Sequence, residues 1–130
     1  MNSVSEDVKD MLEDKSELGL VFSENLFIGR EPTTPDDCVT LFDTPGSNPQ
    51  LTLDNAAYEY PSMQIRVRSN DYSTGYALAE DIKTSLHGQA QETWNGTLYS
   101  VIQVSNGPFL LGWDDNDRCL FIINLTMQRR

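Results

Sequence analysis

The chain is poor in the residues that most often carry catalysis or bind metal ions. It has one histidine, His87, and two cysteines, Cys38 and Cys119. Two cysteines are too few for a disulfide framework and match no metal-ligand spacing, so we expect buried free thiols. His87 precedes Gly88 at the end of a predicted helix, where a histidine usually caps the helix. No serine or cysteine stands beside it as an evident nucleophile.

Long apolar runs are also missing. Hydrophobic residues make up 38% of the chain, and no run approaches the length that spans a bilayer. No signal peptide precedes the first predicted helix. We therefore expect one soluble domain over residues 1–130, made in a reducing cytosol and without a membrane partner.

Positive charge is scarce as well. Nine lysines and arginines stand against 20 acidic residues, which gives a net charge of -11. Such acidity opposes tight non-specific binding to nucleic acid, because the phosphates are repelled. It is compatible with a surface along which DNA passes without sticking. The simpler interpretation is that the charge keeps the protein soluble.

The acidic clusters lack the partners that a metal site requires. Residues 113–117 (WDDND) resemble the start of a calcium loop, but Cys119 and Leu120 stand where a ligand and a glycine are needed. A hairpin turn is the better interpretation. Asp36 and Asp37 lack the lysine that a metal-dependent nuclease would place on the next strand. We therefore predict no catalytic residue, metal or cofactor, and no enzymatic activity.

The first half of the chain predicts a helix and two short strands. Ser3 and Glu6 form a capping box, and the helix is expected to end near Gly19. Strands are expected at 26–28 and 38–42, and the second is closed by the turn residues 43–46.

A long loop is expected at about 44–61. The segment has no clear periodicity, yet it contains Leu51, Leu53, Tyr58 and Tyr60. A loop of this length in a compact domain is usually functional or disordered. Its apolar and aromatic residues gain from burial, which favours a contact with another chain. We therefore predict that these four residues lie at an interface with another chain.

The next strand carries two arginines. Met63, Ile65 and Val67 alternate with polar residues, so Arg66 and Arg68 are expected on the polar face of a half-buried strand. One interpretation is a solvated face whose ion pairs contribute little. The other is a protein interface, where arginine is enriched and pairs with carboxylates in a defined register. We include both arginines in the candidate interface.

The remaining pattern completes an α+β fold. Asn70 and Asp71 are expected to cap a helix that ends at 86–88, and a polar linker follows. Strands are expected at 98–104, 109–113 and 120–128, joined by tight turns at 106–107 and 115–117. Core residues of the last strand are expected to be Phe121, Ile123, Leu125 and Met127. The fold predicted is a single mixed, largely antiparallel β-sheet with two α-helices packed on one face.

Several segments together resemble a known family. They are PDDCVTLFDTPG (35–46), YPSMQIRVR (60–68), LHG (86–88), NGTLY (95–99) and GWD (112–114). In their order and spacing they are similar to the minor capsid or tail-terminator proteins of tailed phages. The resemblance runs from about residue 3 to 128.

The resemblance implies a structural virion protein of the neck region, assembled in the host cytoplasm. Members of the family form a homo-hexameric ring at the head-proximal end of the tail tube. The ring stops tube polymerisation and provides the surface that docks on the head–tail connector. In such a ring the candidate interface would face a neighbouring subunit or the tail tube; it comprises Leu51, Leu53, Tyr58, Tyr60, Arg66 and Arg68. The implied partners are other copies of the chain, the tail tube protein, the connector or head-completion protein, and genomic DNA that passes through the lumen without specific binding.

The sequence leaves three alternative functions open. A head-completion or connector protein of the phage neck would share the size, the acidity and the ring. A small ligand-binding or enzymatic α+β domain is also conceivable, although no polar constellation supports it. A third alternative is an interaction protein that binds host factors and is absent from virions.

Overall fold

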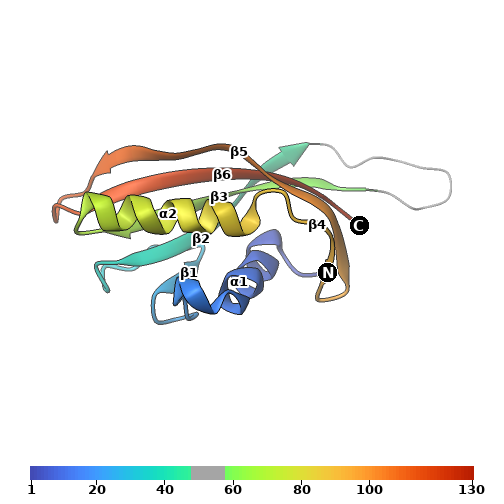
Figure 1. Cartoon of the computed structure of the whole chain (residues 1–130), viewed down its shortest axis with the longest axis horizontal. Coiled ribbons are helices and arrows are strands. Elements are labelled where there is room, and N and C mark those ends of the chain that lie inside the picture. Colours follow the sequence, from blue (N-terminus) through green and yellow to red (C-terminus); the bar gives the residue numbers. More distant parts are fainter. Residues whose placement is uncertain (48–57) are drawn as a thin grey trace.

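The computed structural model describes residues 1–47 and 58–130. It contains one six-stranded sheet of order β1-β2-β3-β6-β5-β4, two α-helices and one 3-10 helix (Figure 1). The elements in chain order are α1 (Val4–Asp14), η1 (Ser16–Leu18), β1 (Leu26–Ile28), β2 (Cys38–Ser47), β3 (Tyr60–Ser69), α2 (Tyr72–Leu86), β4 (Ala90–Trp94), β5 (Thr97–Trp113) and β6 (Cys119–Arg129).

The sheet is mixed but largely antiparallel, as predicted. β1 runs parallel to β2, and every other neighbouring pair is antiparallel. β3 and β6 lie in the middle of the sheet and pair along most of their length. These two central strands therefore position β2 and β1 on one side of the sheet and β5 and β4 on the other.

One core cluster joins the sheet to both helices. Met63, Ile65 and Val67 of β3 are buried, as are the predicted residues of β6: Phe121, Ile123, Leu125 and Met127. Val8 and Leu12 of α1 and Ile82 of α2 belong to the same cluster. Successive strand residues point to opposite faces, so this alternating set defines the face that both helices cover (Figure 1).

The predicted starts of both helices are confirmed. Ser3 accepts a hydrogen bond from the backbone of Glu6, whose carboxylate accepts one in return, which is the expected capping box. Asp71 caps α2 by accepting from the backbone N–H of Thr74. The first helix ends at Asp14 rather than at Gly19, because the chain leaves helical geometry at Lys15 and tightens into η1.

The predicted boundary of β2 is wrong. The strand does not close at the turn residues 43–46 but continues through Pro45 and Gly46 to Ser47. β1 pairs with β2 only as far as Leu41, so Pro45 lies where β2 has no strand on that side within the described chain. A proline is tolerated in a strand at such an edge position. Residues 44–47 and 60–61 of the expected loop therefore belong to β2 and β3, and residues 48–57 of it lie outside the described chain.

The predicted turn at 106–107 is also wrong. The two strands expected at 98–104 and 109–113 are one strand, β5, which bends through Gly107 and shifts register against β6 on both sides of it. Gly107 has φ +96°, and a Cβ there would meet the carbonyl oxygen of Ile122. Glycine thus permits a close approach within a bent strand rather than a reversal.

The predicted polar linker after Gly88 contains a strand. β4 pairs with β5 from Ala90 to Trp94, although its side chains are largely polar and exposed. The turn expected after Trp113 is confirmed and joins β5 to β6. Cys38 and Cys119 are buried and free, as expected, and His87 caps the end of α2.

Candidate subunit and tube interface

Arg68 is buried rather than solvated. Its Nε donates to the carbonyl oxygen of Asp36 at 3.1 Å and its Nη2 to that of Pro35 at 2.6 Å. Nη1 lies 3.5 Å from a carboxylate oxygen of Glu31. The expectation of a solvated polar face is therefore wrong at this position. The arginine holds the loop between β1 and β2 against the sheet.

Arg66 is the more accessible arginine of the strand. Its side chain is 30% exposed, and its guanidinium carbon lies 5.3 Å from the ring centroid of Phe42. Nε is 3.9 Å from Oε2 of Glu31, and neither atom has a hydrogen-bond partner among the described residues. Because this pairing is loose, Arg66 retains donors for a carboxylate on another molecule.

Tyr58 and Glu59 lie beside the C-terminus. The Arg130 guanidinium carbon is 5.0 Å from the ring centroid of Tyr58. Glu59 and Arg129 exchange two backbone hydrogen bonds, and Nε of Arg129 donates to the Glu59 carboxylate at 3.2 Å. The segment after residue 57 is thus tied to the end of β6. Leu51 and Leu53, predicted for the same interface, fall outside the described residues.

A groove lies next to Tyr60 on the sheet face that the helices leave open. Its volume is about 540 Å³. Ser62, Thr126 and Gln103 are neighbours on adjacent strands and contribute to its lining. None of the described residues that line it is charged. These described lining residues are Pro45, Gly46, Ser47, Tyr60, Ser62, Val101, Gln103, Thr126, Met127 and Gln128.

A buried polar network connects α1 to the end of β6. The hydroxyl of Tyr99 donates to the carboxylate of Asp7, and Asn95 donates to the other Asp7 oxygen at 2.8 Å. Arg129 donates to the Tyr99 hydroxyl at 3.2 Å and also pairs with Glu59. Burial, followed by the hydrogen bond to Asp7, raises the pKa of Tyr99. The network therefore fixes the N-terminal helix to the base of the segment at 58–60.

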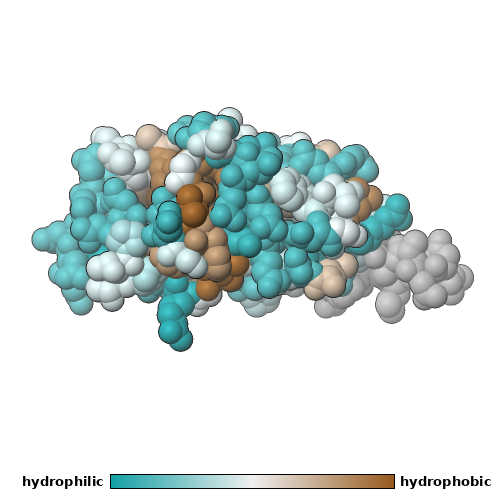
Figure 2. Space-filling model, turned by 90° about the horizontal axis from the view of Figure 1, so that it is seen from below, coloured by the Kyte–Doolittle hydropathy of each residue, from teal (hydrophilic) through white to brown (hydrophobic). Residues whose placement is uncertain are grey.

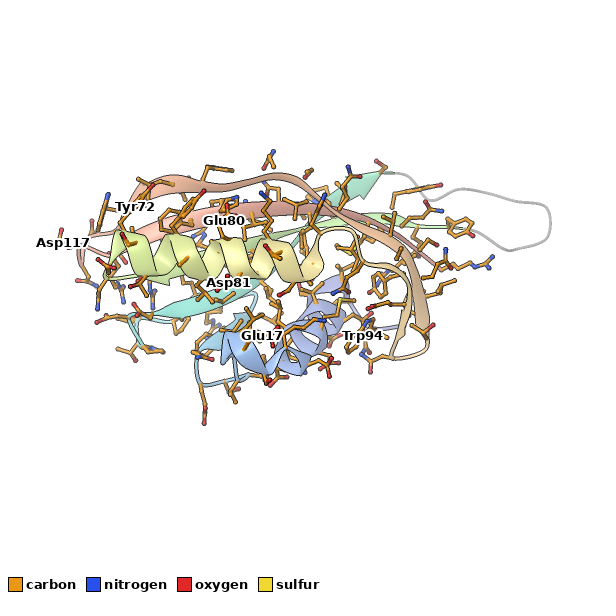
Figure 3. The ribbon with its side chains drawn as sticks, in the orientation of Figure 1. Glu17, Tyr72, Glu80, Asp81, Trp94 and Asp117 are labelled. Atoms are coloured by element: carbon orange, nitrogen blue, oxygen red, sulfur yellow. The ribbon has the colours of Figure 1, made fainter. Side chains whose placement is uncertain are left out.

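Aromatic side chains cluster at the end of the molecule that lies opposite residues 58–60. Tyr72 and Tyr76 of α2 stack with a centroid distance of 6.2 Å, and both meet Phe121 edge-on. Figure 3 shows Tyr72 and Asp117 at this same end. The neighbouring part of β5 exposes four large apolar side chains: Phe109, Leu110, Leu111 and Trp113. Sequence reasoning missed this surface, although no charged residue occurs between Glu92 and Asp114.

A smaller apolar surface lies on the side of α1 and β1. Figure 2 shows this side as largely hydrophilic with a hydrophobic band across it. Val21 and Phe22, which connect η1 to β1, are both exposed, and Lys9 lies 5.0 Å from the Phe22 ring centroid. Isolated exposed apolar residues of this kind are normal on a protein surface.

One acidic residue of the β5–β6 turn, Asp114, is engaged in hydrogen bonds within the turn itself. Asp114 accepts hydrogen bonds from the backbone N–H groups of Asn116 and Arg118 and from the Arg118 side chain. These bonds and the Arg118 charge lower the pKa of Asp114 against the opposing effect of desolvation. Within residues 1–47 and 58–130 no cluster of ligands suited to a metal ion is found. In the same ranges, no helix has the length and apolarity to cross a membrane.

Comparison with known proteins identifies the family. The family model described as bacteriophage tail terminator protein matches residues 9–130. No curated protein sequence matches the chain. Among solved structures, a chain from the virion of a native gene transfer agent particle has a similar fold, with a TM-score of 0.70 and 13% sequence identity. The match covers 98% of this chain and 94% of that one.

The family match extends over most of the chain, and the structural match extends over nearly all of it. The members of the matched family are structural proteins of phage tails. The solved chain with the similar fold comes from the virion of a gene transfer agent particle. The chain therefore belongs to the bacteriophage tail terminator family and is a structural, tail-associated virion protein.

Proposed function

We propose that the protein forms a ring at the head-proximal end of a phage tail tube, where it stops tube polymerisation and provides the surface for head docking. The observation that carries this proposal is the family match over residues 9–130. The similarity of the fold to a virion chain supports it. In this role the protein acts by binding, and no catalytic residue is assigned.

A closed ring of identical subunits needs two different surfaces on each copy, because its contacts are head-to-tail. Arg66 supplies a partly exposed cation on the open face of the sheet. The acidic residues of α1 supply carboxylates on another side of the molecule. A contact between these two surfaces joins neighbouring copies in a homo-hexamer.

The segment around 48–60 contacts the tail tube in this proposal. Leu51 and Leu53 provide its apolar side chains, and Tyr58 and Tyr60 stand at its C-terminal base. Ser47 and Tyr60 both line the groove, so the groove lies between the described residues that flank the segment. Tube protein and connector are then bound by different ends of one ring.

The charge of the chain suits a channel for DNA. A ring of such copies multiplies the net charge of -11 around its lumen. Phosphates are repelled by an acidic wall, so genomic DNA passes without sticking. The tail and neck location and assembly in the host cytoplasm follow from this role.

The test is tail length in particles from a phage that lacks this gene, measured by negative-stain electron microscopy. We expect tubes that grow well beyond the normal length, and complementation with the wild-type gene restores the length. Tails of normal length that fail to join filled heads would instead assign the protein to the connector.

A further inference from the structure

One edge of the sheet is left open along much of β5. β4 pairs with β5 from Thr97 to Val101, and two further backbone bonds extend the contact to Ile102. His87 accepts the Val104 N–H. Beyond it, the described chain places no strand beside residues 105–113, which we name the β5 edge.

The opposite side of the sheet has a second open edge. β1 pairs with β2 only over Val39–Leu41, and Gly29 adds one backbone bond to Leu41. In the described ranges, no strand lies beside residues 42–47 on that side, and we name this segment the β2 edge. Each copy therefore carries two different edges without a neighbouring strand among the described residues, and such edges are templates for pairing with another chain.

The composition of the β5 edge favours a covered strand. Phe109, Leu110 and Leu111 are consecutive, so large apolar side chains project from both faces of the strand. All three are exposed in the single chain. A continuous apolar run is typical of a strand that is covered on both faces, whereas a strand with one wet face alternates.

Charge indicates that the covering chain is another copy. The net charge of -11 makes two copies repel each other, and a neutral surface adds nothing to that repulsion. The β5 edge has no charged residue, and the β2 edge has only Asp43. That carboxylate is occupied, because the N–H and hydroxyl of Ser5 both donate to it.

We propose that the β5 edge of one copy pairs with the β2 edge of the next copy, so that the sheet continues from subunit to subunit. This inference rests on the proposed ring and adds a backbone contact to the proposed contact between Arg66 and the acidic residues of α1. The two edges lie on opposite sides of one sheet, as head-to-tail contact requires. Pro45 and Pro108 each remove one donor, which keeps the added ladder short.

The strand directions make this pairing antiparallel. β3 runs antiparallel to β2, β6 to β3 and β5 to β6, so β5 and β2 run in opposite directions. Rotation about an axis roughly along the strands preserves these directions in the neighbouring copy. The β5 edge of one copy therefore meets an oppositely directed β2 edge.

The register between the two edges sets the tilt of the strands. Phe109 lies level with Thr40 across the sheet, whereas full overlap of the open edges brings Phe109 opposite Thr44. This offset of about four residues is about 14 Å along the strands, against about 19 Å across the four strands from β2 to β5. The resulting tilt of about 35° falls in the range of closed barrels.

Paired cysteines in assembled tails test the inference. Ser47→Cys is combined with Ser105→Cys, Asn106→Cys or Leu111→Cys, which samples three registers on exposed positions. We expect oxidation to give a ladder of linked copies on a non-reducing gel for at least one pair. Each single variant stays monomeric, because neighbouring copies present different edges. The native cysteines are buried and do not interfere.

Ser47→Cys with Ser16→Cys is the control pair, because Ser16 is exposed in η1, which packs against the two helices rather than forming part of a sheet edge. No ladder is expected from it. Absence of a ladder from all three test pairs, in tails of normal length, overturns the edge pairing and leaves tube termination intact. Tails of normal length without the gene would overturn the proposed function instead.

A charge placed on the β5 edge provides a second test. Leu111→Lys is compared with Val21→Lys, since both side chains are about half exposed and lie on different surfaces. We expect Leu111→Lys to reduce the amount of protein retained on tails at least tenfold while the thermal unfolding midpoint is unchanged. Equal retention of the two variants contradicts the proposal.

Discussion

Arg68 donates a hydrogen bond of 2.6 Å to the carbonyl oxygen of Pro35, and this contact joins a central strand to the loop before β2. Arg66, two residues earlier on the same face, has no bond of comparable quality within the described chain. Two arginines with the same position in the sequence pattern thus have different roles. The first stabilises the fold, and the second is available to a partner.

Removing each arginine should separate these roles. Arg68→Ala leaves two carbonyl groups and Glu31 without their donor in a buried site, so we expect a loss of about 2–4 kcal/mol of unfolding free energy. Arg66→Ala should cost less than about 1 kcal/mol, because its ion pair is loose and partly exposed. Urea unfolding of both variants measures the difference. Equal losses would contradict the assignment.

Charge reversal at Arg66 should weaken the ring without unfolding the subunit. Arg66→Glu replaces the exposed cation by a carboxylate and repels an acidic neighbour. We expect less protein on purified tails and a larger fraction of overlong tubes, both counted by electron microscopy. Unchanged occupancy with a normal unfolding midpoint would remove Arg66 from the interface.

Tyr99→Phe should destabilise the protein and alter its response to alkaline pH. The hydroxyl is buried and donates to Asp7, so its loss is expected to cost about 1–3 kcal/mol at neutral pH. The pKa of Tyr99 is raised in the folded state by burial and by Asp7. Its contribution is therefore complete below the unfolded pKa of about 10 and is lost as pH rises above it.

Urea unfolding at several pH values checks this linkage. We expect the free energy of unfolding of the wild type to fall more steeply above pH 10 than that of Tyr99→Phe, so the two curves converge. Curves that remain parallel across the alkaline range would show that Tyr99 does not titrate differently in the two states.

Gly107→Ala should be more damaging than Gly88→Ala. Both glycines have positive φ, so alanine introduces backbone strain of about 1–2 kcal/mol at either position. At Gly107 the new Cβ also meets the carbonyl oxygen of Ile122, whereas at Gly88 no atom lies within 4 Å. We therefore expect a clearly lower unfolding midpoint for Gly107→Ala in calorimetry. Similar midpoints would mean that β5 can move away from β6 at low cost.

The apolar pair in the segment before β3 should affect assembly rather than folding. We expect Leu51→Ser with Leu53→Ser to lower retention on tails, because these side chains are predicted to be buried against the tube. The unfolding midpoint should change little. Gln50→Ser with Thr52→Ser serves as the matched control. Equal retention of both double variants would exclude a tube contact at the two leucines.

The helix starts, the alternation of β3 and the core residues of β6 were predictable because they depend on local periodicity and capping. The resemblance to tail terminators was also available from the sequence, since it depends on the order of several short segments. The positions at which strands end were less predictable. Pro45 and Gly107 look like turn residues, yet both lie within strands, because an open edge accepts a proline and a bent strand accepts a glycine.

The candidate interface shows the same division. The sequence placed Arg66 and Arg68 on one polar face, since successive strand residues alternate. Only the tertiary structure showed that Arg68 is buried, because the covering loop comes from residues far away in the chain. Tyr58 and Tyr60 were recognised by composition, but their proximity to Arg130 and to the groove depends on the pairing of distant strands.

What the sequence determined by itself is the fold class, the acidity, the family resemblance and the inward faces of its helices and strands, because these follow from composition and local spacing. Tertiary structure decided which arginine is accessible, where the chain turns and which sheet edges are open among the described residues. The open edges depend on where β1 and β4 end relative to β2 and β5, and the accessibility of each arginine depends on the loop between β1 and β2. Neither relation can be predicted from the local sequence pattern.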